Sequence, residues 1–238
     1  MIDPEKIQQD YYRNSAAQYD DFHTAGQDSE HDISLFFLSS VLELNASKSI
    51  LDVGAGTGRA MKFLSKKFDH IQITGLEPVE SLREIAYSKG ISRNDLLAGD
   101  GYSIPFPDNS FDIVSEFGVL HHVKYPEKML REMIRVSKQG IFISDSNNFG
   151  QGSLPIKMMK WVLSALGAWK LFDYLKTGGR GFRVSETDGL SYSYSVFDSY
   201  SLLKTVCSEI YFFNLQGRKG INPFKNAGHI ALYARKSN

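Results

Sequence analysis

The chain has 238 residues, 42% of them hydrophobic, which is enough for one sizeable core or for a core with a lid, so we expect a single domain. Its 27 basic and 27 acidic side chains cancel to zero net charge, which disfavours nucleic acid as a partner. The single cysteine, Cys207, excludes an intramolecular disulfide, and the first residues lack the basic and apolar stretches of a secretion signal. We therefore expect a cytoplasmic protein.

The first predicted elements are helices. Residues 4–22 begin at Pro4 and place apolar side chains, including Tyr11 and Tyr12, at helical spacing. A second helix is expected near residues 30–44, directly before the first strand.

The first strand, Ile50–Val53, leads into a glycine loop and then into a helix over Arg59–Phe68. Three glycines occupy alternate positions of the loop: Gly54, Gly56 and Gly58. Such glycines let the backbone turn tightly and approach a ligand, as in the first strand-to-helix turn of a doubly wound sheet. A dinucleotide fingerprint counted from Gly54 would need a glycine where this chain has Arg59.

Asp52, two residues before the loop, argues further against a dinucleotide, because its carboxylate would repel a pyrophosphate. S-adenosylmethionine instead offers a sulfonium, an ammonium and one carboxylate. A carboxylate beside exposed backbone N–H groups suits that methionine end. The sequence therefore favours S-adenosylmethionine over NAD.

Two further acids end the next strands. The strand 71–77 ends in Glu77, about 20 residues after the last glycine, where a carboxylate can accept both ribose hydroxyls. The strand Leu96–Ala98 precedes Asp100 and Gly101, and Asp100 could receive the adenine amino group.

Strands and helices continue to alternate. Residues 111–116 predict a fourth strand, Pro126 begins a helix that Gly140 ends, and residues 141–144 predict a fifth strand. This alternation implies a mainly parallel sheet, with ligands gathered at the carboxyl ends of its strands. Five candidate residues fall at those ends: Asp52, Glu77, Asp100, Phe117 and Asp145.

With these residues, the chain resembles the class I S-adenosylmethionine-dependent methyltransferases, in particular the group of the ubiquinone and menaquinone biosynthesis methyltransferases. The resemblance covers about residues 45–145 and rests on four motifs in order: the loop 51–59, Glu77-Pro78, residues 99–112 and Gly118–Val123. It implies a Rossmann-like, mostly parallel seven-stranded sheet with an antiparallel last strand. It also implies that the leading helix covers the cofactor and that S-adenosylhomocysteine is the product.

The cofactor-binding residues that follow from the motifs and the resemblance are Tyr11, Tyr12, Asp52, Gly54, Ala55, Gly56, Gly58, Glu77, Pro78, Asp100, Gly101, Phe117 and His122. The expected division of the single domain is a helical cover over 1–45, a cofactor core over 46–145, an acceptor-binding insert over 146–200 and a sheet-completing segment over 201–238.

Methyl transfer is an in-line displacement, so a base is needed only where the acceptor loses a proton. His121 and His122 follow the fourth strand, and an imidazole with a pKa near 6.5 could take that proton. We expect His121 first and His122 second as the base, with Asp145 orienting one of them. The alternative is that one histidine merely caps a helix or hydrogen-bonds the loop. No spacing of ligand residues predicts a metal.

The insert leaves its role open. Residues 154–175 are apolar nearly all round, yet Lys160 and Lys170 make them a poor membrane span. They predict lid helices packed on the sheet or, alternatively, an apolar entrance for a lipid-linked acceptor or an interfacial anchor. The glycine-rich stretch Gly178–Arg183 and the residues after it predict either a mobile loop that meets an acidic or sugar acceptor or a solvated linker.

We therefore expect an enzyme that methylates oxygen, or less readily nitrogen, of a small-molecule or glycan-like acceptor. Two alternatives are a nicotinamide-dependent oxidoreductase, which Arg59 and Asp52 oppose, and a non-catalytic module that binds the cofactor or a partner. The sequence names neither the acceptor nor the oligomeric state.

Overall fold

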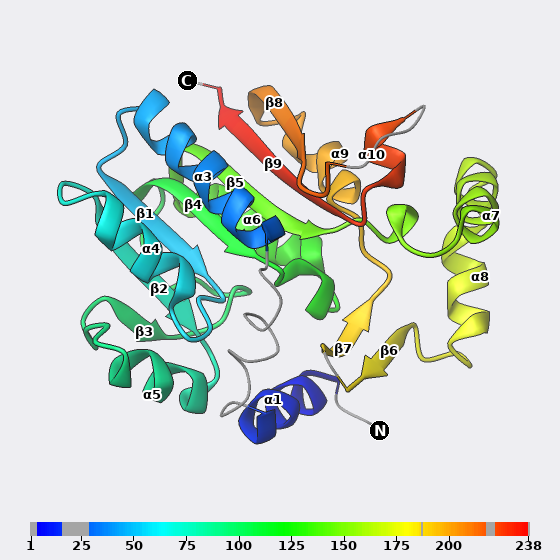
Figure 1. The fold of residues 1–238 in the computed structure, drawn as a ribbon, viewed down its shortest axis with the longest axis horizontal. Coiled ribbons are helices and arrows are strands. Elements are labelled where there is room, and N and C mark those ends of the chain that lie inside the picture. Colours follow the sequence, from blue (N-terminus) through cyan, green and yellow to red (C-terminus); the bar gives the residue numbers. More distant parts are fainter. Residues whose placement is uncertain (1–3, 16–28, 187, 218–221, 238) are drawn as a thin grey trace.

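A seven-stranded sheet forms the centre of the computed structural model, which describes residues 4–15, 29–186, 188–217 and 222–237 (Figure 1). Its strands are β1 (Ser49–Val53), β2 (Gln72–Glu77), β3 (Leu96–Ala98), β4 (Phe111–Phe117), β5 (Ser137–Ser146), β8 (Cys207–Asn214) and β9 (His229–Lys236). They lie in the order β3-β2-β1-β4-β5-β9-β8. Strand β9 runs antiparallel to both of its neighbours, and β1 to β5 are parallel. The predicted Rossmann-like sheet with an antiparallel last strand is confirmed.

Helices cover both faces of the sheet. The helices of the described residues, not all of which pack on the sheet, are α1 (Pro4–Ser15), α3 (Ser29–Leu44), α4 (Arg59–Lys67), α5 (Glu80–Ser88), α6 (Pro126–Val136), α7 (Leu154–Ala165), α8 (Trp169–Lys176), α9 (Tyr200–Leu203) and α10 (Pro223–Asn226). The predicted first helix is present as far as Ser15, and its expected continuation to residue 22 lies outside the described residues.

Two apolar clusters hold these layers together. On one face, Leu38 of α3 and Leu64 of α4 pack against Ile50 and Ile113 of the sheet. On the other face, α6 buries a single stripe against β4 and β5: Met129, Leu130, Met133 and Val136. This spacing is that of an amphipathic helix, which explains why α6 could be predicted from the sequence.

Gly140 does not end the preceding helix, contrary to our expectation. That helix ends at Val136, Ser137 is already extended, and Gly140 lies within β5 opposite Arg235. A Cβ at Gly140 would lie 2.6 Å from the carbonyl oxygen of Ala234. The glycine is therefore required by close strand packing and not by a helix cap.

The insert after β5 forms two hairpins. Helices α7 and α8 stand at the side of the molecule away from the sheet (Figure 1), and α7 contacts α8 and the 3₁₀ turn Asn148–Gly150. The helical insert expected after strand five is therefore present, and its two helices stand away from the sheet. Part of the segment expected as a loop or linker is an antiparallel ladder of β6 (Phe182–Ser185) and β7 (Gly189–Tyr192), against which α1 packs. Among the described residues, no helix has the length and apolar character that crossing a bilayer requires.

Candidate active site

The glycine loop after β1 has a backbone that only glycine fits. Gly54 and Gly58 both have φ of +76°. A Cβ on Gly54 would lie 2.4 Å from Cγ2 of Val119, and one on Gly58 would lie 1.9 Å from Cδ1 of Ile91. The N–H groups of Gly54 and Ala55 both donate to the carbonyl of Leu76, at 2.7 and 3.1 Å, and so fix the loop against β2.

Glu77, at the end of β2, is buried beneath this loop. One carboxylate oxygen accepts the N–H of Gly56 at 2.9 Å, and the other accepts the N–H of Val79 at 2.8 Å. Burial raises the pKa of Glu77 to about 7, although both N–H donors oppose the rise. The guanidinium of Arg83 donates to the carbonyls of Glu77 and Pro78, at 2.7 and 2.9 Å, so Pro78 takes part here through its backbone.

Asp52 is only 3% exposed and faces the same region. The hydroxyl of Ser115 donates to its carboxylate at 3.0 Å. Burial raises the pKa of Asp52 to about 7, the Ser115 hydrogen bond opposes the rise, and the charge of Glu77 adds to it. A cationic group beside Asp52 would stabilise its ionised form.

A cavity of about 400 Å³ opens at the carboxyl ends of β1, β4 and β5. It brings together seven of the predicted site residues: Tyr12, Asp52, Gly54, Ala55, Phe117, His121 and His122. Gly56 and Gly58 complete the loop behind this wall, and the fully buried Asp145 supports His121 from β5.

Glu77 and Pro78 do not line this cavity, and three further predicted cofactor residues are placed elsewhere. The Tyr11 hydroxyl donates to the carbonyl of Glu186 at 3.0 Å, facing the β6–β7 hairpin. Asp100 is exposed, and one of its oxygens accepts the N–H groups of Tyr102 and Ser103 at 2.7 and 3.2 Å. A Cβ on Gly101 would meet Sδ of Met129 at 2.7 Å. The described residues that line the cavity do not include these three.

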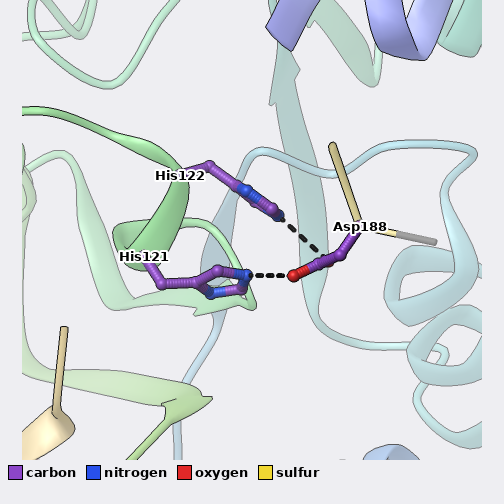
Figure 2. Close-up of side chains that lie close together, drawn as sticks. All are labelled: His121, His122 and Asp188. Atoms are coloured by element: carbon purple, nitrogen blue, oxygen red, sulfur yellow. Dashed lines mark ion pairs between the residues drawn. The ribbon is translucent and has the colours of Figure 1, made fainter. Parts of the chain in front are cut away.

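His121 lies between two carboxylates. Its Nδ1 is 2.5 Å from an oxygen of Asp145, and its backbone N–H donates to the other Asp145 oxygen at 3.2 Å. Its Nε2 points to Asp188, 3.3 Å away, and Nε2 of His122 is 3.5 Å from the same carboxylate (Figure 2). The expected approach of Asp145 to His121 is therefore present, and Asp188 is an addition that sequence reasoning missed.

These neighbours set the charge of His121. Its side chain is 12% exposed, and this burial opposes a positive charge. The charges and hydrogen bonds of Asp145 and Asp188 together outweigh burial and raise the pKa of His121 well above its usual range. Burial would raise the pKa of Asp145, but the positive charge of His121 lowers it overall. His121 is thus an imidazolium between two carboxylates at neutral pH.

His122 is held differently. Its Nδ1 lies 2.6 Å from the carbonyl oxygen of Leu190 in β7, to which an Nδ1–H donates. The Gln8 side chain contacts both Leu190 and His122. Its Oε1 accepts the N–H of Leu190 at 2.5 Å, and its Nε2 lies 3.1 Å from Nδ1 of His122. Burial and the positive charge of His121 lower the pKa of His122. The pair therefore consists of one charged and one neutral imidazole.

Glu116 of β4 lies behind this pair and was not predicted. One of its oxygens accepts the N–H of Val119 at 2.8 Å. Burial, reinforced by the charge of Asp145, raises the pKa of Glu116 well above its usual range. The neighbouring charge of Asp145 thus favours the protonated form of Glu116.

The cluster in Figure 2 also has the composition of a cation site. One ligand atom each from His121, His122 and Asp188 lies within 4.8 Å of the other two. Imidazole nitrogen and carboxylate oxygen are common zinc ligands. The ion pairs between Asp188 and the histidines account for the same geometry without an ion, so the expected absence of a metal stays a prediction, which chelation can test.

A polar group borders the cavity and was also missed. The Gln216 amide donates to Glu30 at 2.8 Å, and Nδ1 of His229 is 3.7 Å from the same carboxylate. The hydroxyl of Ser144 lies 3.2 Å from Nε2 of His229. These residues come from distant parts of the chain, so no local sequence motif predicts that they lie together.

Several known proteins with similar sequences are named as methyltransferases. Residues 51–144 match the family model described as "Methyltransferase domain". A demethylmenaquinone methyltransferase of Thermotoga maritima is 34% identical over 99 residues, or 42% of each chain. A ubiquinone/menaquinone biosynthesis C-methyltransferase of Pseudomonas fluorescens is 30% identical over 139 residues, 54% of this chain and 53% of that one. An ajmaline N-methyltransferase of Rauvolfia serpentina is 35% identical over 101 residues, covering 40% and 34%. The matches thus span about half or less of these relatives.

Solved structures are similar over nearly the whole chain. A magnesium protoporphyrin IX methyltransferase of Synechocystis, with bound S-adenosylhomocysteine, has a TM-score of 0.63 at 14% identity and covers 98% of this chain and 100% of its own. A plantazolicin methyltransferase, also with S-adenosylhomocysteine, has a TM-score of 0.55 at 17% identity, covering 98% and 95%. At such identities the likeness shows the fold.

Proposed function

Since residues 51–144 match the model of a methyltransferase domain, we propose that the chain is a class I S-adenosylmethionine-dependent methyltransferase of the ubiquinone and menaquinone biosynthesis group and that it methylates an oxygen of a small, polar acceptor. S-adenosylmethionine is the donor and S-adenosylhomocysteine the product. One observation supports this most directly: the glycine loop, Asp52 and the paired histidines meet in one cavity.

The donor would be held by the loop and by three acids. Asp52 pairs with the cationic methionine end, and Gly54 and Ala55 form the wall beside it. Glu77 accepts the ribose hydroxyls, which then share its oxygens with the N–H groups of Gly56 and Val79. Asp100 lies outside the cavity and caps its own turn with one oxygen, and its other oxygen is the proposed acceptor for the adenine amino group.

The acceptor would lie against the polar border of the cavity. Glu30, Ser144, Gln216 and His229 offer donors and acceptors suited to hydroxyl groups, which favours a polyol or glycan-like molecule. Nitrogen is the second choice for the methylated atom. The named relatives include an N-methyltransferase and a C-methyltransferase, so the atom is a question for experiment.

His121 is the proposed base. When the acceptor hydroxyl takes the place of Asp188 at Nε2, His121 loses one of the two carboxylates that raise its pKa and can accept a proton. The acceptor oxygen then bonds to the methyl carbon as the carbon–sulfur bond breaks, and the electron pair of that bond goes to sulfur. Asp145 keeps Nε2 aimed at the acceptor throughout by binding Nδ1.

Two measurements test the proposal. Calorimetric titration should show micromolar binding of S-adenosylmethionine and S-adenosylhomocysteine to the wild type and weaker binding to Glu77→Ala. On an acceptor identified by screening, His121→Asn should lower kcat by about 10²-fold or more with the donor affinity unchanged. His70→Asn, at an exposed histidine, is the matched control and should change neither quantity.

Two results would reject parts of the proposal. No donor binding by the wild type would remove the methyltransferase assignment, whereas unchanged turnover of His121→Asn would remove only the base. Activity lost on treatment with EDTA and restored by a divalent ion would instead assign His121, His122 and Asp188 to a cation.

A further inference from the structure

The α7–α8 hairpin exposes its apolar side chains and buries its first two lysines. Lys157 and Lys160 are 6% and 7% exposed. Of the 17 large apolar side chains exposed among the described residues, nine lie on this hairpin. Six of the nine are non-aromatic and more than half exposed: Leu154, Met158, Val162, Leu166, Leu171 and Leu175.

Hydrogen bonds of the lysines fix this orientation. The ammonium of Lys160 donates to the carbonyls of Asn148 and Gln151, at 2.7 and 3.3 Å, and to the side-chain oxygen of Asn148 at 3.0 Å. The ammonium of Lys157 donates to the carbonyl of Asn226 at 3.2 Å. A rotation of α7 that buried its apolar face would break all of these contacts. The apolar face is therefore a stable surface of the folded protein.

The charges on the hairpin have one sign. Within residues 154–180, all of which the structure describes, the only acid is Asp173, which is buried and paired with Arg183. The exposed charged side chains of this range are Lys170, Lys176 and Arg180. Since the whole chain is neutral, this combination of exposed apolar and cationic groups is local to the hairpin.

We propose that the α7–α8 hairpin lies in the interface of an anionic lipid bilayer. Its apolar side chains would enter the boundary of the acyl chains, and Lys170, Lys176 and Arg180 would meet the headgroups. Helix α7 has 12 residues, well short of the roughly 20 needed to cross, so it lies along the surface. This proposal goes beyond methyl transfer and does not depend on it.

A second copy of the chain fits the surface less well than a bilayer. In a two-fold symmetric pair the same patch meets itself, so the cations of one copy would approach those of the other. Asp173 offers no compensation, because it is buried and already paired with Arg183. An anionic lipid surface satisfies both the apolar and the cationic groups.

The hairpin is also connected to the active site. The indole N–H of Trp169 in α8 donates to the hydroxyl of Ser193 at 2.9 Å, and the Asn148 amide donates to the same hydroxyl at 2.9 Å. Ser193 directly follows β7, whose Leu190 binds His122. The hairpin is therefore linked through Ser193 to the strand that binds His122.

Flotation of the delipidated full-length protein with vesicles tests the proposal. The wild type should bind vesicles of equal parts phosphatidylglycerol and phosphatidylcholine at least about tenfold more tightly than pure phosphatidylcholine. Leu166→Ser combined with Leu171→Ser should weaken this binding by about tenfold or more, because two apolar side chains leave the interface. Lys170→Gln combined with Lys176→Gln should remove most of the preference for the anionic lipid.

Leu44→Ser is the matched control, since Leu44 on α3 is 70% exposed and Leu166 is 74% exposed. This variant should bind like the wild type, and all variants should keep the wild-type thermal midpoint. Wild-type protein that stays free of anionic vesicles would overturn the proposal, as would full binding by the Leu166 and Leu171 variant. A dimer in solution that this variant abolishes, without vesicle binding by the wild type, would assign the surface to a second copy.

Discussion

Three buried carboxyl groups near the cavity differ in pKa because their neighbours differ. The positive charge of His121, which contacts Asp145, lowers the pKa of that carboxyl. Burial and the charge of Asp145 raise the pKa of Glu116. Asp52 has a hydroxyl as its hydrogen-bond partner, and burial raises its pKa to about 7. Side chains of one chemical type thus have pKa values shifted in opposite directions within one site.

Asp52→Asn should stabilise the protein more at pH 8 than at pH 5. The folded state raises the pKa of Asp52 from 3.8 to about 7, so it binds more protons than the unfolded chain within that window. The free energy of unfolding therefore falls as pH rises through it, and the variant removes this loss. We expect a gain of about 1–3 kcal/mol at pH 8, measured by calorimetric unfolding at both pH values. The exposed Asp69→Asn is the control, and an equal gain at both pH values would contradict the prediction.

Asp188→Asn should move the pH dependence of kcat/KM to lower pH. Asp188 helps to raise the pKa of His121, and a base is active only after losing its proton, so wild-type activity should rise with pH. Without the Asp188 charge the midpoint should fall by about one pH unit. Glu186→Gln, two positions away and exposed, should leave the profile unchanged. A profile that Asp188→Asn does not move would show that Asp188 has no electrostatic effect on the base.

At the scale of elements, two glycines separate two effects of a glycine-to-alanine substitution on the free energy of unfolding. One effect is the strain of a positive φ, and the other is a steric clash of the added Cβ. The two glycines lie in the loop after β1 and in the turn after α5. Gly58 and Gly90 have φ of +76° and +92°, but only Gly58 has a neighbour, Cδ1 of Ile91, within 2 Å of an added Cβ.

Gly90→Ala should cost about 1 kcal/mol from backbone strain and leave donor binding unchanged. Gly58→Ala should lower the free energy of unfolding by about 1–3 kcal/mol more than Gly90→Ala, because the added Cβ overpacks the site, and it should weaken donor binding. Adding Ile91→Val to Gly58→Ala should recover part of this loss, because the substitution removes Cδ1. Chemical denaturation and calorimetric titration measure the two effects, and equal costs at the two glycines would refute the clash.

Sequence patterns predicted the elements best where one face of an element is buried. The apolar spacing of α6 located it correctly, because its polar side chains face solvent. The same rule failed for α7, since Lys157 and Lys160 point inward to carbonyl groups of Asn148, Gln151 and Asn226. Those acceptors lie on other segments, so no local pattern could reveal them. Gly140 was misread for a related reason, as its close neighbour comes from β9.

At the scale of the whole molecule, the topology explains which site residues could be foreseen. Asp52, Phe117 and Asp145 lie at or near the carboxyl ends of parallel strands, which a doubly wound sheet brings to one edge. Asp188 comes from the insert, and Glu30 and Gln216 lie 186 positions apart, so their approach depends on tertiary packing. The zero net charge of the chain likewise did not predict the cationic surface of α7–α8, because acidic residues elsewhere in the sequence balance its positive charges.

Gln8 joins two parts of the chain that are 182 positions apart. It accepts the N–H of Leu190 and lies against His122, so the histidine pair rests on a helix close to the N-terminus. A variant that lacks α1 would leave the sheet and the glycine loop in place but would take away the contact of Gln8 with Leu190 and His122. Donor and acceptor binding could then be affected separately, because the histidine pair depends on a helix that is no part of the sheet.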